Sequence, residues 1–293
     1  MAKKFIGFKS KTIKHPMINA LTVDLEDWYH ICGTYENTTP SKWAEYETRV
    51  TSNTNKILSI LRQYNTKATF FVLGYIAHKE PDLIKTIHNE GHEIATHGYY
   101  HRRIFELSRA EFEEDTKKSI DILESITGEK VLGYRAPEWS IRNNTLWALD
   151  LLKKLGLRYD SSMVPLTRMG ERSFGPYPYR IKTEYGNIWE FPLTTMRCLW
   201  ENLPFTGGLP LRIAPYWYIL SKLKWINYKA FKPGLVYIHP WEFDDKHPKI
   251  ELPLSRRFMH YFNVRATRPK IEGLLKHMKF GPIRDVIRMD RDD

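Results

Sequence analysis

The sequence predicts an α/β protein with a largely parallel sheet, either open or closed into a barrel. Short β-branched and aromatic runs alternate with stretches of helical spacing at least four times along the chain. The chain has 293 residues, 42% of them hydrophobic, which is enough for one large domain with a buried core. The charged fraction of 27% is that of ordinary globular proteins and argues against a disordered chain or a coiled coil.

Most of the predicted strands are short runs that end at or just before a glycine, a carboxylate or a histidine. The predicted strands are residues 18–24, 67–73, 92–96, 187–192 and 234–239, with a further strand end at 133–137. Each predicted helix has apolar residues at helical spacing or a recognisable start or stop signal. The predicted helices are residues 53–64, 81–91, 108–126 and 144–155. Ser108, followed three residues later by Glu111, forms a capping box at the start of the third helix.

The remaining segments depart from this rhythm. Residues 1–16 carry five lysines and no acid, which predicts a basic N-terminal arm. A single domain is expected over 17–293, with a helical extension at its C-terminal end. Residues 193–233 contain four prolines and several aromatic residues, which predicts an irregular insertion or lid.

The net charge of +11 asks for a partner of opposite sign, such as nucleic acid, anionic lipid or a phosphorylated substrate. The sequence has no nucleic-acid-binding motif, so no nucleic-acid partner is expected. No apolar run approaches the ~20 residues of a membrane-spanning helix, and residues 1–9 lack the apolar stretch of a secretion signal. Two isolated cysteines, Cys32 and Cys198, indicate a reducing compartment. We therefore expect a cytoplasmic protein.

Four of the predicted strand ends carry unusual polar clusters. In parallel α/β folds the carboxyl ends of the strands gather at one edge, where binding loops lie. Asp24, Glu26 and Asp27 place three carboxylates within four residues, an arrangement that either sits in water or shares a cation. His97 and His101 lie four residues apart after a strand and can face one divalent metal if the segment is helical or tightly turned.

The other two strand ends supply an arginine and a third histidine. Arg135 can grip a carboxylate through two parallel hydrogen bonds, and His239 ends a strand beside Trp241. Each cluster taken alone also fits an ordinary surface or structural role. Together, one carboxylate and two histidines form a three-ligand set that leaves a metal position open, and the other groups supply a base, its orienting partner and an acid. Metal-assisted hydrolysis is the reaction class that uses all four ends.

The predicted cofactor is a divalent metal. Zn²⁺ is expected first, and Co²⁺, Ni²⁺, Mn²⁺ and Fe²⁺ also suit a site of nitrogen and oxygen ligands. The sequence has no glycine-rich phosphate loop and no Gly-x-Ser-x-Gly elbow, which argues against nucleotide binding and serine hydrolysis.

The order and spacing of these motifs resemble the polysaccharide deacetylases, relatives of chitin and peptidoglycan N-deacetylases in carbohydrate esterase family four. The motifs are Thr22–Asp24, Lys67–Gly74, Gly91–His101, Gly133–Pro137 and Val236–His239. The resemblance covers about residues 18–240, and the region around 207–244 resembles a bacterial branch found with exopolysaccharide and O-antigen synthesis genes. It implies a distorted (β/α) barrel of about seven parallel strands and removal of an N-acetyl group from a sugar.

The resemblance also implies a role for each motif residue. Asp24 matches the general base, Arg135 the residue that orients this base, and His239 the general acid that protonates the leaving amine. His97 and His101 match the two histidine ligands of the metal.

The carboxylate ligand departs from the usual pattern. Many family members place a metal-binding aspartate directly after the base, where this chain has Leu25. Glu26 is expected to replace it, because strand alternation puts Asp24 and Glu26 on one face, and Asp27 is the alternative. Asp160 is a further candidate, as the aspartate that tunes the acid histidine. Five residues beside the motifs are predicted to contact the saccharide: Trp28, Tyr100, Pro137, Trp139 and Trp241.

Residues 197–232 suggest a partner. They hold six Lys/Arg, one acid and several aromatic residues, and the stretch 215–226 is amphipathic and cationic. Such a stretch can lie on an anionic membrane, which with the expected location suggests a lipid-linked saccharide substrate. The same aromatic residues also fit a protein core or a sugar cleft.

Two other functions remain open from the sequence. A hydrolase of a non-sugar amide or cyclic imide could use the same barrel. An inactive saccharide-binding module could keep the fold while Leu25 marks a lost metal site. The oligomeric state is not indicated by the sequence.

Overall fold

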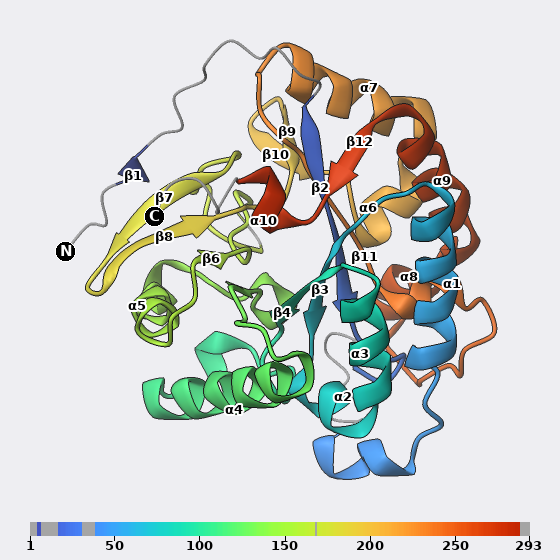
Figure 1. Cartoon of the computed structure of the whole chain (residues 1–293). Coiled ribbons are helices and arrows are strands. Elements are labelled where there is room, and N and C mark those ends of the chain that lie inside the picture. The colour runs from blue at the N-terminus through green and yellow to red at the C-terminus, as the bar shows by residue number, and fades with distance from the viewer. Residues whose placement is uncertain (1–4, 7–16, 31–38, 168, 288–293) are drawn as a thin grey trace.

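The computed structural model describes residues 5–6, 17–30, 39–167 and 169–287 (Figure 1). Within these residues, seven strands run parallel in succession through the main sheet. In spatial order they are β11 (Leu235–Ile238), β2 (Ile18–Leu25), β3 (Thr69–Val72), β4 (Glu93–Thr96), β5 (Gly133–Tyr134), β6 (Tyr159–Asp160) and β8 (Gly186–Glu190). The prediction of a mostly parallel α/β sheet is confirmed, and the arrangement is consistent with a distorted barrel.

Three further strands extend the sheet. β7 (Tyr179–Thr183) pairs antiparallel with β8, and β1 (Phe5–Ile6) pairs antiparallel with β7. β12 (Lys279–Gly281) pairs parallel with the first residues of β2. The predicted C-terminal helical extension therefore also contributes a strand to the main sheet.

Strand β2 shows how the sequence positions the site. Leu21, Val23 and Leu25 belong to the core between the sheet and the outer helices, whereas Ala20 belongs to the cluster on the other face. Side chains alternate along a strand, so Asp24 shares the inner face with Ala20. The departure at Leu25 therefore puts an apolar side chain into the helix-facing core.

The ring of parallel strands is completed by a connecting segment after β8. The backbone N–H of Phe191 donates to the carbonyl of Asp160 (2.8 Å), and that of Leu193 donates to the carbonyl of Met163 (3.1 Å). The N–H of Leu235, at the start of β11, donates to the hydroxyl of Thr194 (2.6 Å). In the described residues this segment, rather than pairing between β8 and β11, spans the gap between the two ends of the parallel run.

Helices from the first half of the chain cover the outside of the sheet (Figure 1). They are α1 (Val50–Gln63), α2 (Gly74–Lys79), α3 (Pro81–Asn89), α4 (Arg109–Thr127) and α5 (Trp147–Lys154). The predicted capping box of α4 is present, with reciprocal bonds between Ser108 and Glu111 of 3.2 and 2.8 Å. Short 3₁₀ turns occur at Pro40–Glu45, Ile104–Glu106, Pro137–Trp139, Asn143–Thr145, Pro240–Phe243 and Val264–Ala266.

The segment 193–233 is ordered rather than irregular, so the prediction of an irregular insertion is wrong. It contains a hairpin and two helices: β9 (Thr195–Cys198), β10 (Glu201–Pro204), α6 (Gly208–Ile213) and α7 (Tyr216–Tyr228). Two of its prolines stand at helix starts, where a missing N–H costs no helical hydrogen bond. Pro210 lies in the first turn of α6, and Pro215 is the N-cap of α7.

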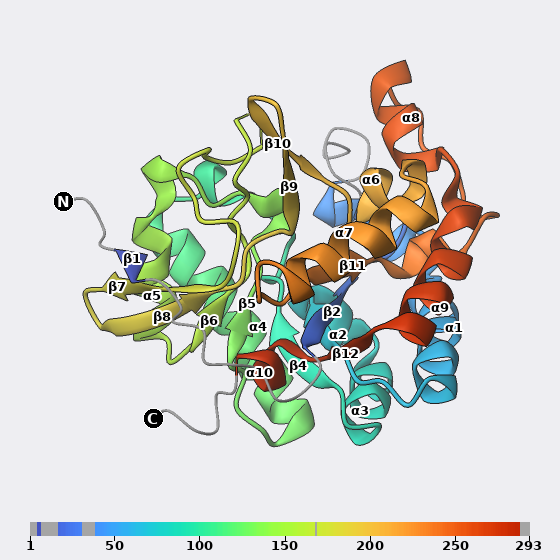
Figure 2. The same ribbon diagram turned by 90° about the horizontal axis from the view of Figure 1, so that it is seen from above.

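The C-terminal region adds α8 (Leu254–Tyr261), α9 (Thr267–His277) and α10 (Ile283–Val286). Figure 2 shows α6, α7, α8 and α9 grouped on the side of the molecule away from β1 and β7. None of the helices in the described part of the chain is both long and apolar enough to cross a lipid bilayer.

Candidate metal centre and active site

The carboxyl ends of β2 and β4 bring together Glu26, His97 and His101. The Oε1 atom of Glu26 lies 3.1 Å from Nε2 of His97 and 3.0 Å from Nε2 of His101. Each residue offers one ligand atom, and these three atoms lie within 4.8 Å of one another. All three side chains are buried. They form a compact group of one oxygen and two nitrogen ligands.

The hydrogen bonding of His97 indicates what this group can hold. Its Nδ1 lies 2.7 Å from the backbone carbonyl of Arg135, and a carbonyl can only accept, so Nδ1 carries the proton. A neutral His97 then presents a lone pair at Nε2, which cannot donate to Glu26. The Nε2 lone pair would then face the carboxylate oxygen, and this contact is favourable only with a second proton on the ring or with a cation between the two side chains. A carbonyl behind the ring that fixes the tautomer is the usual support of a metal-binding histidine, so the group fits a divalent metal with open positions.

The charges of the group favour the same interpretation. Burial would raise the pKa of Glu26, but His101 and His97 outweigh it and hold this pKa well below its usual value. Burial would lower the pKa of His101, but the Glu26 carboxylate outweighs it and raises this pKa. A buried carboxylate with positive charge drawn to it is the electrostatic setting of a cation site.

A tight turn, not a helix, brings the two histidines together. Gly98 and His101 have left-handed backbone conformations, with φ of 75° and 54°. The carboxylate of Asp115, in α4, accepts the backbone N–H groups of Tyr99 (2.7 Å) and Tyr100 (3.2 Å) and so fixes the turn. A Cβ at Gly98 would lie 2.9 Å from Asp115 Oδ2, so this position requires glycine. Sequence reasoning missed Asp115, because nothing in the α4 pattern distinguishes it from a surface carboxylate.

Asp27 lies apart from the histidines. Its Oδ2 accepts the backbone N–H groups of Arg49 (2.7 Å) and Val50 (3.0 Å) and the hydroxyl of Thr48 (3.0 Å). Its Oδ1 accepts the backbone N–H of Trp28 (2.8 Å). The side chain therefore caps the start of α1, and of the two alternatives the geometry favours Glu26 as the third ligand.

Asp24 is held by Arg135 at the inner face of β2. One Nη of Arg135 lies 2.5 Å from Asp24 Oδ1 and 2.9 Å from the hydroxyl of Thr22. Ser161 accepts two further hydrogen bonds, at its backbone carbonyl (3.0 Å) and at its hydroxyl (2.9 Å). The guanidinium also lies over two aromatic rings, at 4.1 and 4.5 Å from their centroids, those of Phe71 and Trp139. So many contacts leave the buried arginine one orientation, which fixes the carboxylate of Asp24.

His239 faces Asp24 from the end of β11. Its Nε2 lies 3.9 Å from Asp24 Oδ2, and its ring stacks on Trp241 with centroids 5.0 Å apart. On the other side of the ring, Nδ1 lies 3.5 Å from Glu242 Oε2, and Glu242 Oε1 lies 3.4 Å from Nε of Arg212. His239, Glu242 and Arg212 thus form a series of side chains of alternating charge.

The neighbouring carboxylates change the proton affinity of His239. Burial would lower the pKa of His239, but Glu242, together with Glu26 and Asp24, outweighs it and raises the pKa to about 9. Burial would raise the pKa of Glu242, but His239 and Arg212 outweigh it and lower this pKa. Glu242 was missed as a site residue, although its spacing of three residues from His239 was visible. Arg212 gave no sequence signal.

Asp160 is not the partner of His239. Its Oδ1 accepts the hydroxyl of Ser162 (2.5 Å), and it pairs with the carboxyl of Glu190 beside Arg135. Burial raises the pKa of Asp160 to about 6, and burial and then the neighbouring Asp160 raise the pKa of Glu190 well above its usual value. The two carboxyl groups lie together in a buried environment, which favours a proton shared between them.

The predicted saccharide contacts differ in exposure. The rings of Trp28, Trp139 and Trp241 are buried, and Pro137 is buried as well, whereas Tyr100 is 36% exposed. The Trp28 indole donates to the carbonyl of Glu47 (2.9 Å) within an aromatic cluster that includes Trp241. Contact of these five residues with a saccharide stays a prediction.

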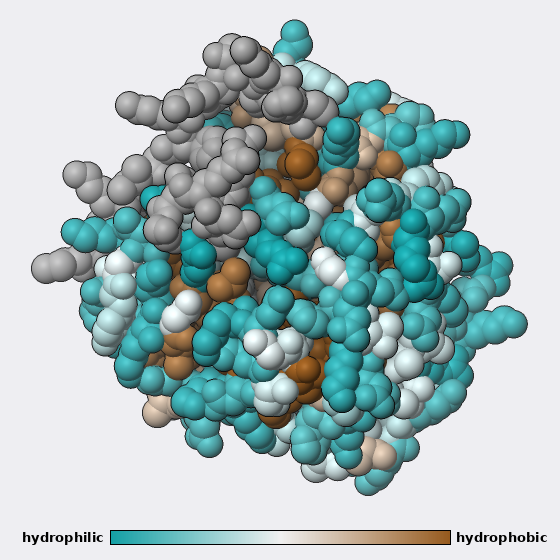
Figure 3. Space-filling view, in the orientation of Figure 1, coloured by the Kyte–Doolittle hydropathy of each residue, from teal (hydrophilic) through white to brown (hydrophobic). Residues whose placement is uncertain are grey.

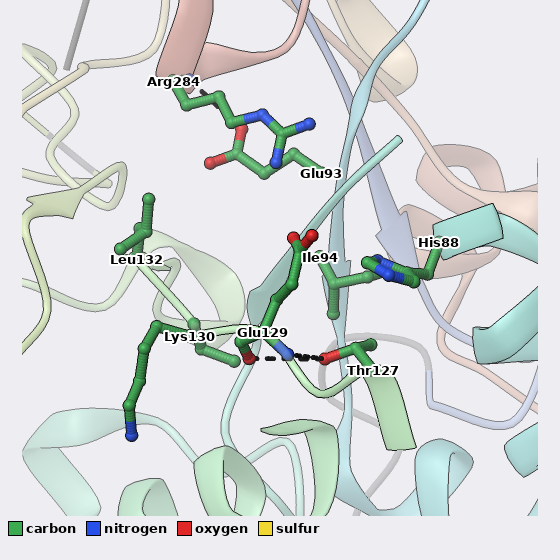
Figure 4. A pocket seen from close by; sticks show the side chains of 9 residues that line it. His88, Glu93, Ile94, Thr127, Glu129, Lys130, Leu132 and Arg284 are labelled. Carbon is green, nitrogen blue, oxygen red and sulfur yellow. Dashed lines mark hydrogen bonds between the residues drawn. The ribbon is translucent and has the colours of Figure 1, made fainter. Parts of the chain in front are cut away.

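A small pocket elsewhere has no part in this centre. It lies at the start of β4, where Figure 4 shows Glu93 beside Arg284, whereas His97 follows the other end of that strand. The Glu93 carboxylate accepts bonds from the backbone N–H of Arg284 (3.2 Å) and from Thr69 and Tyr159, so it joins α10 to the sheet.

Sequence comparisons divide the chain into two matched parts. Residues 34–159 match the family model described as polysaccharide deacetylase, and residues 161–288 match a domain of unknown function (DUF3473). A peptidoglycan-N-acetylglucosamine deacetylase of Bacillus cereus is 40% identical over 98 residues, which are 33% of this chain and 36% of the relative. The chain spans 36–42% of the length of the first curated relatives it matches.

Two solved structures share the fold. One is a protein of Mycobacterium smegmatis assigned to the polysaccharide deacetylases, with a TM-score of 0.61 and 22% identity, over 97% of this chain and 94% of that one. The other is a CE4 family pseudoenzyme of Bacillus anthracis, with a TM-score of 0.51 and 15% identity, over 93% of this chain and 66% of that one. Since the second is described as a pseudoenzyme, the fold alone does not decide whether a chain is active.

Proposed function

Residues 34–159 match the polysaccharide deacetylase family model, and from that premise we propose that the chain is a metal-dependent hydrolase that removes an N-acetyl group from an amino sugar. The observation that supports this most is the set Glu26, His97 and His101 at the same sheet edge as the pair Asp24–Arg135. Unlike the fold, this set of side chains is specific to the chemistry.

The three ligands would hold a divalent metal, with Zn²⁺ as the first candidate and Co²⁺, Ni²⁺, Mn²⁺ and Fe²⁺ as alternatives. When bound, such a metal polarises a carbonyl oxygen as a Lewis acid and lowers the pKa of water to about 7. The replacement of an acid by Leu25 leaves the ligand set complete, because Glu26 supplies the carboxylate oxygen.

The residues around the ligands supply the proton transfers of amide hydrolysis. Asp24 takes a proton from the water that attacks the acetyl carbon, and Arg135 holds the Asp24 carboxylate in place for this step. His239 donates a proton to the sugar nitrogen as the carbon–nitrogen bond breaks, because an amide anion is too basic to leave. The products are acetate and the free amino sugar.

Glu242 acts on this step through His239. Its carboxylate raises the pKa of the imidazole, so that His239 is protonated when the amine must leave. Arg212 holds Glu242 and donates three hydrogen bonds to backbone carbonyls of the α8 region, those of Met259, His260 and Phe262. Glu242 and Arg212 are therefore positioning residues.

The finer assignments belong to the same proposal. The substrate would be an N-acetylated saccharide of a bacterial surface polysaccharide or exopolysaccharide, including O-antigen, or its lipid-linked precursor. The relative named as a peptidoglycan-N-acetylglucosamine deacetylase supports the choice of an N-acetylated sugar. A cytoplasmic location would suit the free, exposed thiol of Cys198. The residue Cys32 lies outside the described residues.

The second candidate is an inactive saccharide-binding module, which the structural likeness to a pseudoenzyme keeps in view. It requires a ligand set that does not bind metal. A hydrolase of a non-sugar amide or cyclic imide has no observation in its favour here.

Metal content tests the proposal first. Purified wild type should hold close to one equivalent of transition metal by elemental analysis, and His97→Ala with His101→Ala should lose it. Asp24→Asn should keep the metal and lose about 10²–10⁴-fold in acetate release from N-acetylated glycans. The matched control is Asp82→Asn, an exposed carboxylate of α3, which should change neither.

Two results would contradict the proposal. Wild type without metal after reconstitution would favour the binding module. If the protein holds metal but releases no acetate from any N-acetylated sugar, the metal site would stand and the proposed substrate class would be wrong.

A further inference from the structure

Helix α7 presents an aromatic surface to solvent. Trp217, Trp225 and Tyr228 are 69%, 48% and 64% exposed, and Lys224 is exposed beside them. Positions 217, 224, 225 and 228 recur at helical spacing and so share one face. We call these four residues the α7 face. Single exposed apolar residues are ordinary, but three large rings aligned on one helix form a patch that needs an explanation.

The opposite side of α7 already serves the fold. Ile219, Leu223 and Ile226 are buried in the main core. Asn227 exchanges two hydrogen bonds with Asn19 at the start of β2, of 2.9 and 2.8 Å. The helix is therefore fixed to the sheet in one rotation, and the α7 face is not a core surface left uncovered by a loosely placed helix.

The charge around this face has one sign. Residues 216–233 contain four lysines and no acid. Another ring, Phe231, is 49% exposed just after the helix. In Figure 3 apolar and hydrophilic residues lie side by side at the upper edge of the molecule, where Figure 1 shows α7.

We propose that the α7 face docks on an anionic membrane surface. Tryptophan and tyrosine favour the boundary between lipid headgroups and acyl chains, because one part of each ring is apolar and another is polar. Lysines beside them gain from the negative potential of anionic headgroups. A helix with these two features lies in the plane of the interface. This inference does not depend on the deacetylase activity proposed above.

Charge complementarity selects lipid over a protein partner. A protein that covered α7 would need a matching acidic rim and a separate pocket for each of the three rings. An anionic bilayer supplies negative charge at every position and accommodates rings at any spacing. The bilayer is therefore the occupant that the observed residues fit.

Vesicle flotation of the full-length protein tests the inference. The vesicles are phosphatidylcholine alone and phosphatidylcholine with phosphatidylglycerol, at low and high salt. Wild type should float with the anionic vesicles only, and high salt should release it. Trp217→Ser with Trp225→Ser should abolish flotation. Lys224→Gln with Lys229→Gln should weaken the partition coefficient about fivefold per lysine, which corresponds to about 1 kcal/mol each.

The controls change matched residues outside α7. Lys79→Gln with Lys182→Gln removes two exposed lysines, and Tyr185→Ser removes a ring that is 52% exposed. These variants should float as wild type does. Since every substituted side chain is partly or fully exposed, thermal unfolding should stay at the wild-type temperature, and this measurement separates lost binding from lost folding.

Three outcomes would overturn the inference. The first is failure of wild type to float with anionic vesicles at low salt. The second is flotation that the α7 variants leave unchanged, which would place the contact elsewhere. The third is a concentration-dependent dimer, measured by light scattering, that the tryptophan variants abolish, since a second copy would then be the occupant of the face.

Discussion

Glu242 connects His239, the proposed general acid, to Arg212 and through it to the C-terminal part of the chain. Its carboxylate accepts the backbone N–H of His239 (3.2 Å), and it lies within 3.5 Å of both the imidazole and the Arg212 guanidinium. At the scale of single residues, the charge on this one side chain sets how readily His239 holds a proton.

Replacement of Glu242 should therefore change a pH profile. An acid catalyst must be protonated, so activity falls as the pH rises through the pKa of His239. Glu242→Gln removes a charge that raises this pKa, so the alkaline limb of the kcat/KM profile should move about one pH unit lower. Glu242→Asp keeps the negative charge, so its alkaline limb should lie between those of wild type and Glu242→Gln. A lower rate with an unmoved limb would reduce Glu242 to a packing role.

The candidate site contains residues that the sequence could identify and others that it could not. Glu26 was identifiable because strand alternation and its distance from Asp24 depend only on the local sequence. The choice between Glu26 and Asp27 was not, because it depends on Arg49 and Val50, more than twenty residues away. Arg212 was invisible for the same reason, since its carbonyl partners lie in the α8 region.

At the scale of elements, the capping of α1 by Asp27 explains an early helix start. The sequence predicted this helix from residue 53, and it begins at Val50. Asp27 accepts the N–H groups of Arg49 and Val50, which have no partner inside the helix. A cap from a distant strand end cannot be recognised in the local pattern, which shows only the apolar periodicity.

Removal of this cap should cost stability and leave the metal in place. Asp27→Ala deletes a buried acceptor of four hydrogen bonds, so the free energy of unfolding should fall by about 2 kcal/mol. Urea denaturation measures this loss, and elemental analysis of the same variant should find the wild-type metal content. Loss of metal from a folded Asp27→Ala protein would make Asp27 the ligand after all.

Other elements divide along the same line. The strands and helices with strong periodicity, such as 18–24 and 108–126, were predicted to within a few residues. The sequence indicates α7 only as an amphipathic stretch, because prolines that begin helices also mark loops and turns. Strands as short as β5 and β6, with two residues each, exist through their neighbours in the sheet.

At the scale of the whole molecule, the carboxyl pair Asp160–Glu190 makes stability depend on pH. Burial raises both pKa values in the folded protein, that of Asp160 to about 6. In the unfolded chain both groups ionise near pH 4. The unfolded state therefore binds fewer protons from about pH 4 up through the raised pKa values of the folded protein, that of Glu190 included, so this pair lowers the stability as the pH rises through that range.

A neutral side chain at Glu190 should reduce this dependence. Glu190→Gln keeps the carbonyl that accepts the N–H of Met163 (3.0 Å) and can donate to Asp160. The variant should exceed wild type in free energy of unfolding by about 1 kcal/mol at pH 8, and the difference should fade below pH 4. Urea denaturation at both pH values measures it, with Glu114→Gln, at an exposed glutamate of α4, as control. An equal or lower stability at pH 8 would contradict the shared-proton description.

The two matched stretches of sequence, 34–159 and 161–288, meet at β6, an interior strand of one sheet. Asp24 and Glu26 precede both stretches, His97, His101 and Arg135 lie in the first, and His239 with Glu242 lies in the second. No reacting step can therefore be assigned to either stretch. Recombining one stretch with that of a relative would have to preserve the strand register across β5, β6 and β8. A shift in this register would displace the proposed base, metal ligands or acid at the carboxyl ends of the strands.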